Sequence, residues 1–112
     1  MEKIKVFMKR PDSPKGYMTW ISNTLENLQK NVNGYIETVT KTLSRVDENG
    51  TETETVKIVI ICNEDGRLLG LPYCCTILGI DFVGDIIICG IDGDEFADIP
   101  LTMRECKMII NR

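Results

Sequence analysis

Two nearly continuous apolar runs mark the middle of this chain. The first extends from Ile58 to Cys62 and stops at Asn63-Glu64-Asp65-Gly66, after which an apolar stretch returns from Leu68 to Pro72. The second run has the sequence DIIICGI and extends from Asp85 to Ile91. Strands that are buried on both faces have continuous apolar sequences instead of alternating ones. The pattern therefore predicts that Val56–Cys62 and Asp85–Ile91 are the central strands of a sheet.

The N-terminal segment from Lys3 to Lys9 alternates between apolar and polar positions, as a half-buried strand does. Its apolar face carries Ile4, Val6 and Met8, and its wetter face carries Lys3, Lys5, Phe7 and Lys9. Two prolines and a glycine in Arg10–Gly16 predict a loop, after which Tyr17–Ser22 is expected to form a second short strand. Further along, Thr76–Val83 has a weak pattern that fits either a short helix or an irregular crossing.

Capping signals predict two short helices. Asn23 precedes the first helix, with Glu26 three positions later as a capping box requires, and Gly34 is placed for a left-handed C-terminal cap. The apolar stripe of this helix is formed by Leu25, Leu28 and Val32. The second helix is expected to begin after Thr102, with Glu105 completing its capping box. Its apolar face is formed by Met103, Cys106, Ile109 and Ile110.

A long β-hairpin is predicted around Glu48-Asn49-Gly50, between the segments Tyr35–Asp47 and Thr51–Asn63. Asn-Gly favours a two-residue type I′ turn, and this turn sets the register of the two strands. The resulting pairs are Val39 with Ile60, Leu43 with Val56, Arg45 with Glu54 and, as a like-charge mismatch, Asp47 with Glu52. The outer part, Thr42–Thr55, is polar, so we expect a β-ribbon whose far end leaves the core.

Together these elements predict one α+β domain over residues 1–112. We expect a mixed or antiparallel sheet of about four to six strands, with two short helices on one face and a protruding β-hairpin. The expected core residues are Val6, Leu25, Leu28, Ile36, Val39, Ile58, Ile60, Cys62, Leu71, Ile86, Ile88 and Ile109.

Composition agrees with a folded chain, because 43% of the residues are hydrophobic and 27% are charged. The net charge of −4 argues against direct nucleic-acid binding, which depends on neutralising phosphates. No apolar run approaches the roughly 20 residues that span a membrane, and we expect no signal peptide, because Met1-Glu2-Lys3 runs directly into a strand pattern. The five cysteines are an odd number without a C-x-x-C pair, so we expect free thiols in a reducing cytoplasm.

The chain contains no histidine. This absence removes the Ser-His and Cys-His forms of nucleophile activation and most zinc sites. We therefore expect a protein that is not an enzyme, with no catalytic residue, no metal ligands and no cofactor. We interpret the adjacent Cys74 and Cys75 as small residues in a loop; the alternative is a reactive or redox-sensing thiol near Arg67.

Acidic residues gather once, at Asp92, Asp94, Glu95 and Asp98. Their carboxylates could hold a hard cation, although the spacing lacks the alternating ligands and the downstream glutamate of an EF-hand loop. We interpret the group as a solvated acidic turn between a strand and a helix. A further alternative is an acidic patch that competes for a basic nucleic-acid groove on another protein.

Three motifs occur in order along the chain: GYIE at Gly34–Glu37, ICNEDG at Ile61–Gly66 and GLP at Gly70–Pro72. They are preceded by the segment NTLENLQKNVN and followed by DIIICGIDGDEF. In this order, the segments make the chain from Lys3 to Phe96 resemble an uncharacterised family of small bacterial, phage and plasmid accessory proteins, which is known only as a domain of unknown function. The resemblance implies a setting among mobile elements of bacteria, often from Gram-positive hosts, and it transfers no catalytic residue. The chain departs from the family in a longer extension around Asn49 and in Tyr73-Cys74-Cys75.

The first functional hypothesis is a non-enzymatic binding protein of a phage or mobile element. In its concrete form it is a host-defence antagonist, of anti-CRISPR or antirestriction type, that acts by protein contact in the cytoplasm of a bacterial host cell. Its partner could be a nuclease or a defence complex. The expected contact residues are Arg45, Glu48, Asn49, Glu52 and Glu54 on the ribbon, and Asp92, Asp94, Glu95 and Asp98 in the acidic patch.

Two alternatives belong to other classes of protein. One is a binder of small ligands, such as a sponge for a nucleotide signal, with a pocket near Trp20, Arg67 and Tyr73; Trp20 is also interpreted as a core residue. The other is an accessory protein of a mobile element without a defence role. An apolar edge strand or the ribbon would also be open to a second copy of the chain, which makes a homo-oligomer a further alternative.

Overall fold

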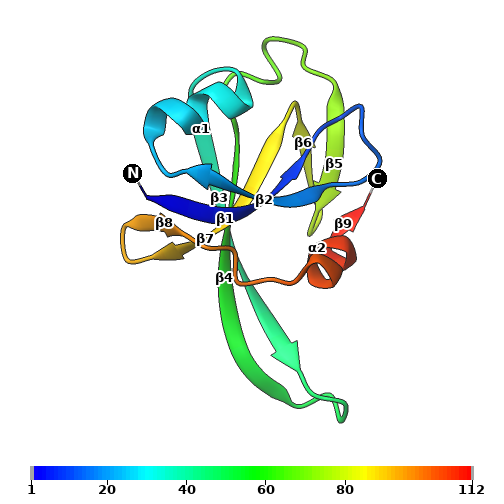
Figure 1. Ribbon diagram of the computed structural model, residues 1–112. Coiled ribbons are helices and arrows are strands. Elements are labelled where there is room, and N and C mark those ends of the chain that lie inside the picture. The colour runs from blue at the N-terminus through cyan, green and yellow to red at the C-terminus, as the bar shows by residue number, and fades with distance from the viewer. Residues whose placement is uncertain (1, 112) are drawn as a thin grey trace.

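The computed structural model describes residues 2–111. Within this range nine strands and two helices follow one another along the chain (Figure 1). They are β1 (Lys3–Lys9), β2 (Tyr17–Ser22), α1 (Leu25–Val32), β3 (Ile36–Val46), β4 (Glu52–Asn63), β5 (Tyr73–Ile77), β6 (Ile80–Val83), β7 (Ile86–Asp92), β8 (Glu95–Ala97), α2 (Met103–Ile109) and β9 (Ile110–Asn111).

The strands form two sheets, and every pairing between them is antiparallel. The larger sheet has the order β2-β1-β7-β4-β3, with β8 also paired to β7. The second sheet has the order β6-β5-β9. The α+β class is therefore confirmed, and β4 and β7 are central as predicted. The larger sheet has six strands, but the described residues hold more strands than expected, because β5, β6 and β9 form a second sheet that was not predicted.

The second sheet arises from the segment for which a short helix or an irregular crossing was predicted. β5 and β6 form a tight hairpin in which Ile77 pairs with Ile80, and both turn residues, Leu78 and Gly79, have positive φ angles of 49° and 84°. Two positive φ angles are typical of a type I′ turn, which favours Asn or Gly. Because leucine rarely occupies such a position, the sequence carried no turn signal here.

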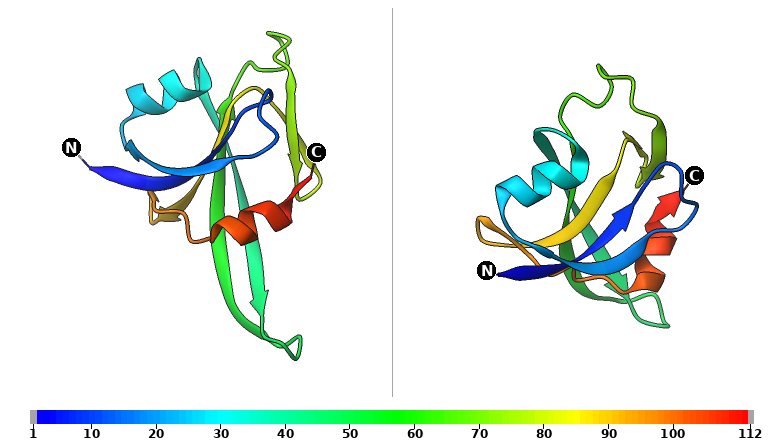
Figure 2. Two further views of the ribbon diagram at one scale, coloured as in Figure 1. Left: turned by 45° about the vertical axis from the view of Figure 1, so that its right-hand side comes forward. Right: turned by 45° about the horizontal axis from the view of Figure 1, so that its top comes forward.

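Both faces of the larger sheet are covered, and each cover includes one helix. One face carries Val6, Val59 and Ile87, and it packs against Leu28 and Val32 of α1. The other face packs against the second sheet and α2, and its cluster includes Phe7, Ile58, Ile88, Cys75 and Cys106. The prediction that both helices lie on one face was therefore wrong; Figure 2 shows α1 and α2 well apart in both views.

The second sheet and α2 also bury residues of β1 that were predicted to lie on its wetter face. Phe7 and Lys9 were assigned to a wetter face, but they are only 1% and 2% exposed. Their face of β1 lies beneath the second sheet and α2, elements that the alternation of β1 could not indicate. β1 is thus buried on both faces along most of its length.

Most of the predicted core is confirmed. Val6, Leu28, Ile58, Ile60, Cys62, Ile86 and Ile88 are buried, and Ile36, Val39, Leu71 and Ile109 are half-buried. Leu25 was wrong, because its side chain is 59% exposed. It occupies the first position of α1, ahead of Leu28 and Val32, which are the residues of this helix that reach the sheet.

The capping box of α2 was predicted correctly. For α1, the predicted N-cap lies one residue before the observed N-cap, and the predicted C-cap lies one residue after the observed C-cap. In α2 the Thr102 side chain and Glu105 form the predicted capping box. In α1 the N-cap is Thr24, whose Oγ1 accepts from the backbone N–H of Asn27 at 3.2 Å, and the left-handed C-cap is Asn33 instead of Gly34. Asn23 instead donates from its side chain to the carbonyl of Phe96 at 3.0 Å, which ties the start of the helix to β8.

Candidate binding surfaces

The β3–β4 hairpin is the feature that projects furthest from the body of the protein (Figure 1). The strands pair from Ile36 and Asn63 at the base to Arg45 and Glu54 near the tip, in the register that was predicted. β4 also pairs with β7, but only over Ile58–Ile61. Beyond Ile58 the hairpin is therefore a two-stranded ribbon with a solvent-exposed end, as the polar sequence of this segment indicated.

The turn at the end of the ribbon differs from the predicted type I′ turn. The backbone N–H of Gly50 donates to the carbonyl of Asp47 at 3.0 Å, and Gly50, instead of Asn49, has the positive φ angle. This is a type I turn followed by a bulge, and it shifts the register so that Val46 pairs with Glu52. The side chain of Asp47 accepts from the N–H groups of Asn49 and Thr51, both at 2.9 Å. The bulge thereby removes the like-charge pair that the type I′ register would have created.

Arg45 joins the ribbon to α2. Its Nε donates to Oε2 of Glu105 at 2.9 Å and its Nη2 to Oε1 of the same carboxylate at 2.9 Å. Nη1 contacts Glu54 Oε1 at 2.6 Å, and Nη2 also donates to the carbonyl of Pro100 at 2.5 Å. A forked, two-point contact of this kind fixes orientation as well as attracting charge. Arg45 and Glu54, which were expected to contact a partner, are thus also used within the chain.

This arrangement shifts the acidity of Glu105. The hydrogen bonds from Arg45, with a further one from the backbone of Thr102, lower its pKa to about 2. The hydrogen bonds with Glu105 and Glu54 in turn raise the pKa of Arg45 above its ordinary value. Both shifts favour the charged forms, so the contact between the ribbon and α2 is an ion pair over the physiological pH range.

Acid is therefore expected to weaken this contact selectively. A carboxylate with a lowered pKa in the folded state contributes stability above its unfolded pKa of about 4.5, and that contribution is lost as pH falls toward 2. Glu105→Gln should lose less stability than the wild type between pH 5 and pH 2, measured by urea denaturation at each pH. Glu48→Gln, at an exposed position of the turn, is the control; equal acid sensitivity of Glu105→Gln and the wild type would contradict the assignment.

The end of the ribbon is acidic. Residues 46–55, here called the acidic tip, contain Asp47, Glu48, Glu52 and Glu54 and no lysine or arginine. All of these residues are exposed, as is Asn49 in the turn. The acidic tip thus presents four of the five predicted ribbon contacts to solvent, namely Glu48, Asn49, Glu52 and Glu54, although Glu54 also forms an ion pair with Arg45.

The second predicted group of acidic residues lies apart from the acidic tip. Asp92, Asp94 and Glu95 are exposed at the β7–β8 turn, here called the acidic turn, and both figures place it well apart from the acidic tip. The turn connects two strands, whereas a strand and a helix were expected. Asp98 is used internally, since its Oδ1 accepts from the backbone N–H of Lys5 at 2.9 Å. Among residues 2–111, no three acidic or cysteine side chains are grouped as metal ligands.

The three residues of the alternative ligand pocket do not line one cavity. Arg67 lines a cavity of about 420 Å³ with Glu37, Glu64 and Asp81, and its Nη2 donates to the carbonyl of Asp81 at 2.9 Å. Neither Trp20 nor Tyr73 lines that cavity. Trp20 is 55% exposed on β2, so the interpretation of this residue as core was wrong, because β2 is an edge strand.

The five cysteines are free and buried. Cys74 and Cys75 lie in β5, not in a loop. The contact with Cys75, together with burial, raises the pKa of Cys74. Burial raises the pKa of Cys62 to about 11 and the pKa values of Cys89 and Cys106 to about 12. A reactive cysteine needs an accessible thiolate, so this environment gives no support to the redox-sensing alternative.

Within residues 2–111, no helix is both long and apolar enough to cross a bilayer. No curated protein and no solved structure matches the chain. Residues 4–110 match a protein family that is described as a domain of unknown function, DUF3846. This match covers nearly the whole chain and includes the Gly34–Glu37, Ile61–Gly66 and Gly70–Pro72 motifs. The chain therefore belongs to the DUF3846 family, as its resemblance to an uncharacterised domain family indicated.

Proposed function

We propose that this protein is a non-enzymatic binding protein that contacts a protein partner through the acidic tip of its ribbon. The observation that carries the proposal is the geometry of the β3–β4 hairpin, whose outer half leaves the body of the fold and ends in exposed carboxylates. A ribbon of two strands gains little stability by itself, so its length contributes little to the core. A segment of this kind is better explained by a contact outside the chain.

The partner that suits the acidic tip has a basic surface or groove. Carboxylates without neighbouring cations attract positive charge, which speeds association and suppresses binding to acidic surfaces. Proteins that grip nucleic acids carry such grooves. This supports the concrete form of the proposal, a host-defence antagonist of a phage or mobile element that occupies the nucleic-acid groove of a nuclease in the bacterial cytoplasm.

Exposure and the contacts of Arg45 support a smaller set of contact residues within this proposal. Glu48 and Glu52 are exposed at the tip and are the primary contacts in the proposal, with Asn49 between them. Arg45 acts as a positioning residue, because its ion pairs hold the ribbon against α2. The acidic turn lies elsewhere on the molecule, so it would reach only a partner that extends over both regions.

The separation of the two acidic groups provides a matched test. The triple variant Asp47→Asn, Glu48→Gln, Glu52→Gln removes three charges from the acidic tip, and Asp92→Asn, Asp94→Asn, Glu95→Gln removes three from the acidic turn. Each tagged protein is used to capture partners from bacterial lysate, and the affinity of the partner recovered by the wild type is then measured. The tip variant should bind at least about tenfold more weakly and the turn variant about equally.

Two further readouts decide the outcome. Wild-type affinity should fall as salt is raised from about 0.05 to 0.5 M, because exposed charges are screened over shorter distances. Circular dichroism of the tip variant should match the wild type, because the acidic tip lies outside the core. Partner binding that is insensitive both to the tip substitutions and to salt would overturn the proposal.

A further inference from the structure

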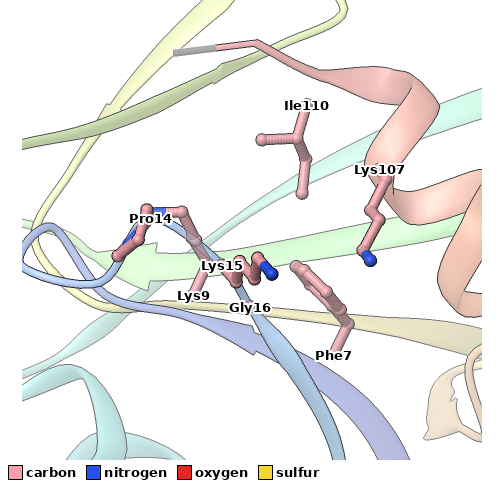
Figure 3. Close-up of a pocket in the computed structure, with 7 residues that line it drawn as sticks. All are labelled: Phe7, Lys9, Pro14, Lys15, Gly16, Lys107 and Ile110. Atoms are coloured by element: carbon pink, nitrogen blue, oxygen red, sulfur yellow. The ribbon is translucent and has the colours of Figure 1, made fainter.

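A basic cleft lies on the side of the protein that carries the second sheet. Its volume is about 240 Å³, and it is lined by β1, the loop of residues 10–16, and the end of α2 with β9 (Figure 3). Three lysines line it, Lys9, Lys15 and Lys107, and no acidic side chain of residues 2–111 does. Since the chain as a whole has a net charge of −4, this local excess of positive charge runs against the overall balance.

Lys9 supplies the fixed charge of the cleft. Lys9 is only 2% exposed, and its Nζ donates to the carbonyls of Arg10 at 2.7 Å and Ser13 at 2.5 Å. Within residues 2–111, no carboxylate forms an ion pair with Lys9. A buried charge without a counter-ion is costly. An anion in the cleft would supply the missing counter-charge.

Two exposed lysines add to this charge from opposite walls. Lys15 comes from the loop and Lys107 from the last turn of α2, and neither forms an ion pair with a carboxylate of the described residues. Figure 3 shows both side chains at the cleft, with the ring of Phe7 between them in this view. Together with Lys9, they would surround an anionic group from three segments of the chain.

The remaining lining is apolar. Phe7, Pro14 and Ile110 form it, together with Gly16. A Cβ atom on Gly16 would overlap the ring of Phe7, so the absence of a side chain lets the loop lie directly on this ring. The cleft is smaller than the roughly 300–1,000 Å³ of typical ligand pockets, which limits its occupant to a small molecule.

We propose that this cleft binds a small organic anion, in which a phosphate or carboxylate group is joined to a single apolar ring. Lys15 and Lys107 would contact the anionic group, the buried charge of Lys9 would add to the attraction, and the ring would lie on Phe7, Pro14 and Ile110. This site is independent of the acidic tip and of the partner proposed for it.

Titration with phenyl phosphate, followed by NMR of the backbone amides, tests the proposal. The amide signals of Gly16, Lys107 and Ile110 should shift and saturate with a Kd below about 1 mM. Benzoate tests the carboxylate form of the ligand, inorganic phosphate tests the anionic group alone, and phenol tests the ring alone. Phenyl phosphate or benzoate should bind at least about tenfold more tightly than either fragment.

Charge reversals identify the site. Lys107→Glu and Lys15→Glu should each weaken binding by about tenfold or more, whereas Lys3→Glu, at the opposite end of β1, should leave it unchanged. The tip variant should also bind the probe normally, which separates this proposal from the function proposed above. The proposal is overturned by the absence of saturating shifts up to about 10 mM probe, by equal binding of both cleft variants and the wild type, or by inorganic phosphate binding as tightly as phenyl phosphate.

Discussion

Replacing Asn63 with alanine is expected to lower the free energy of unfolding by about 3 kcal/mol, one of the largest effects of a single side chain in this protein. Asn63 is buried, and its amide joins two segments. Nδ2 donates to the carbonyls of Val32 at 3.0 Å and Asn33 at 3.2 Å, which end α1, and Oδ1 accepts from the N–H of Asp65 at 2.8 Å. Alanine would leave these groups without their partner, and a buried polar group that loses its partner costs about 1–3 kcal/mol.

The measurement is urea denaturation, in which the midpoint should fall by about 2 M. Asn49→Ala provides the control, because this asparagine is exposed in the ribbon turn and its substitution should change stability by less than about 0.5 kcal/mol. Similar midpoints for the two variants would show that water replaces the Asn63 amide without loss.

A double-mutant cycle sharpens this test. Gly34 lies so close to Asn63 that an added Cβ would be 2.7 Å from Nδ2, and the next nearest atoms belong to the same side chain. Gly34→Ala should therefore be destabilising in the wild type and much less so in the Asn63→Ala background. We expect a coupling energy of at least about 1 kcal/mol, and additive effects would contradict the contact.

Gly90→Ala is expected to be destabilising by about 2–3 kcal/mol for a different reason. An added Cβ would overlap the carbonyl oxygen of Asp98 and would lie 3.3 Å from Cδ of Pro100. Residues 98–100 cross β7 at this point, where the N–H of Ile99 donates to the carbonyl of Lys5 at 2.8 Å. This crossing delivers α2 to the sheet face opposite α1, so displacing it would disturb α2 and the Arg45–Glu105 ion pair together.

Two readouts distinguish this mechanism from a general loss of stability. The pKa of Glu105, measured by NMR, should rise from about 2 toward its ordinary value in Gly90→Ala, because displacement of α2 weakens its contact with Arg45. Gly93→Ala is the comparison, since Gly93 has a positive φ angle and open space around it. It should cost about 1 kcal/mol in backbone strain and leave the Glu105 pKa unchanged. An unchanged Glu105 pKa in Gly90→Ala would contradict the proposed displacement.

The contacts of Asn63 also give a structural role to two of the motifs that carried the resemblance. Gly34 begins GYIE, and Asn63 lies within ICNEDG. The two motifs meet at the C-terminal end of α1, where Gly34 leaves room for the Asn63 amide. These motifs hold the helix on the sheet, and the surfaces proposed for binding lie in other parts of the chain.

Local patterns predicted much of this structure. The continuous apolar runs identified β4 and β7 as central strands, and the threonine and glutamate spacing identified the cap of α2. The alternation around Asn49-Gly50 predicted the ribbon and its register up to Arg45 and Glu54. Each of these features depends on residues close in sequence or on one dominant turn. The position of the acidic tip could be predicted for the same reason.

Only the tertiary structure decided which faces are covered and which distant side chains meet. The burial of Lys9, the placement of Lys9 and Lys107 around one cleft, and the contact of Arg45 with Glu105 all involve segments far apart in the chain. They depend on the crossing at Gly90 and on the pairing of β5 with β9, neither of which leaves a periodic signal. An alternating sequence indicates which face of a strand is buried, but it does not indicate which element buries that face. Long-range packing determines this element, because it must fit the backbone without overlap and provide the buried polar groups with hydrogen-bond partners.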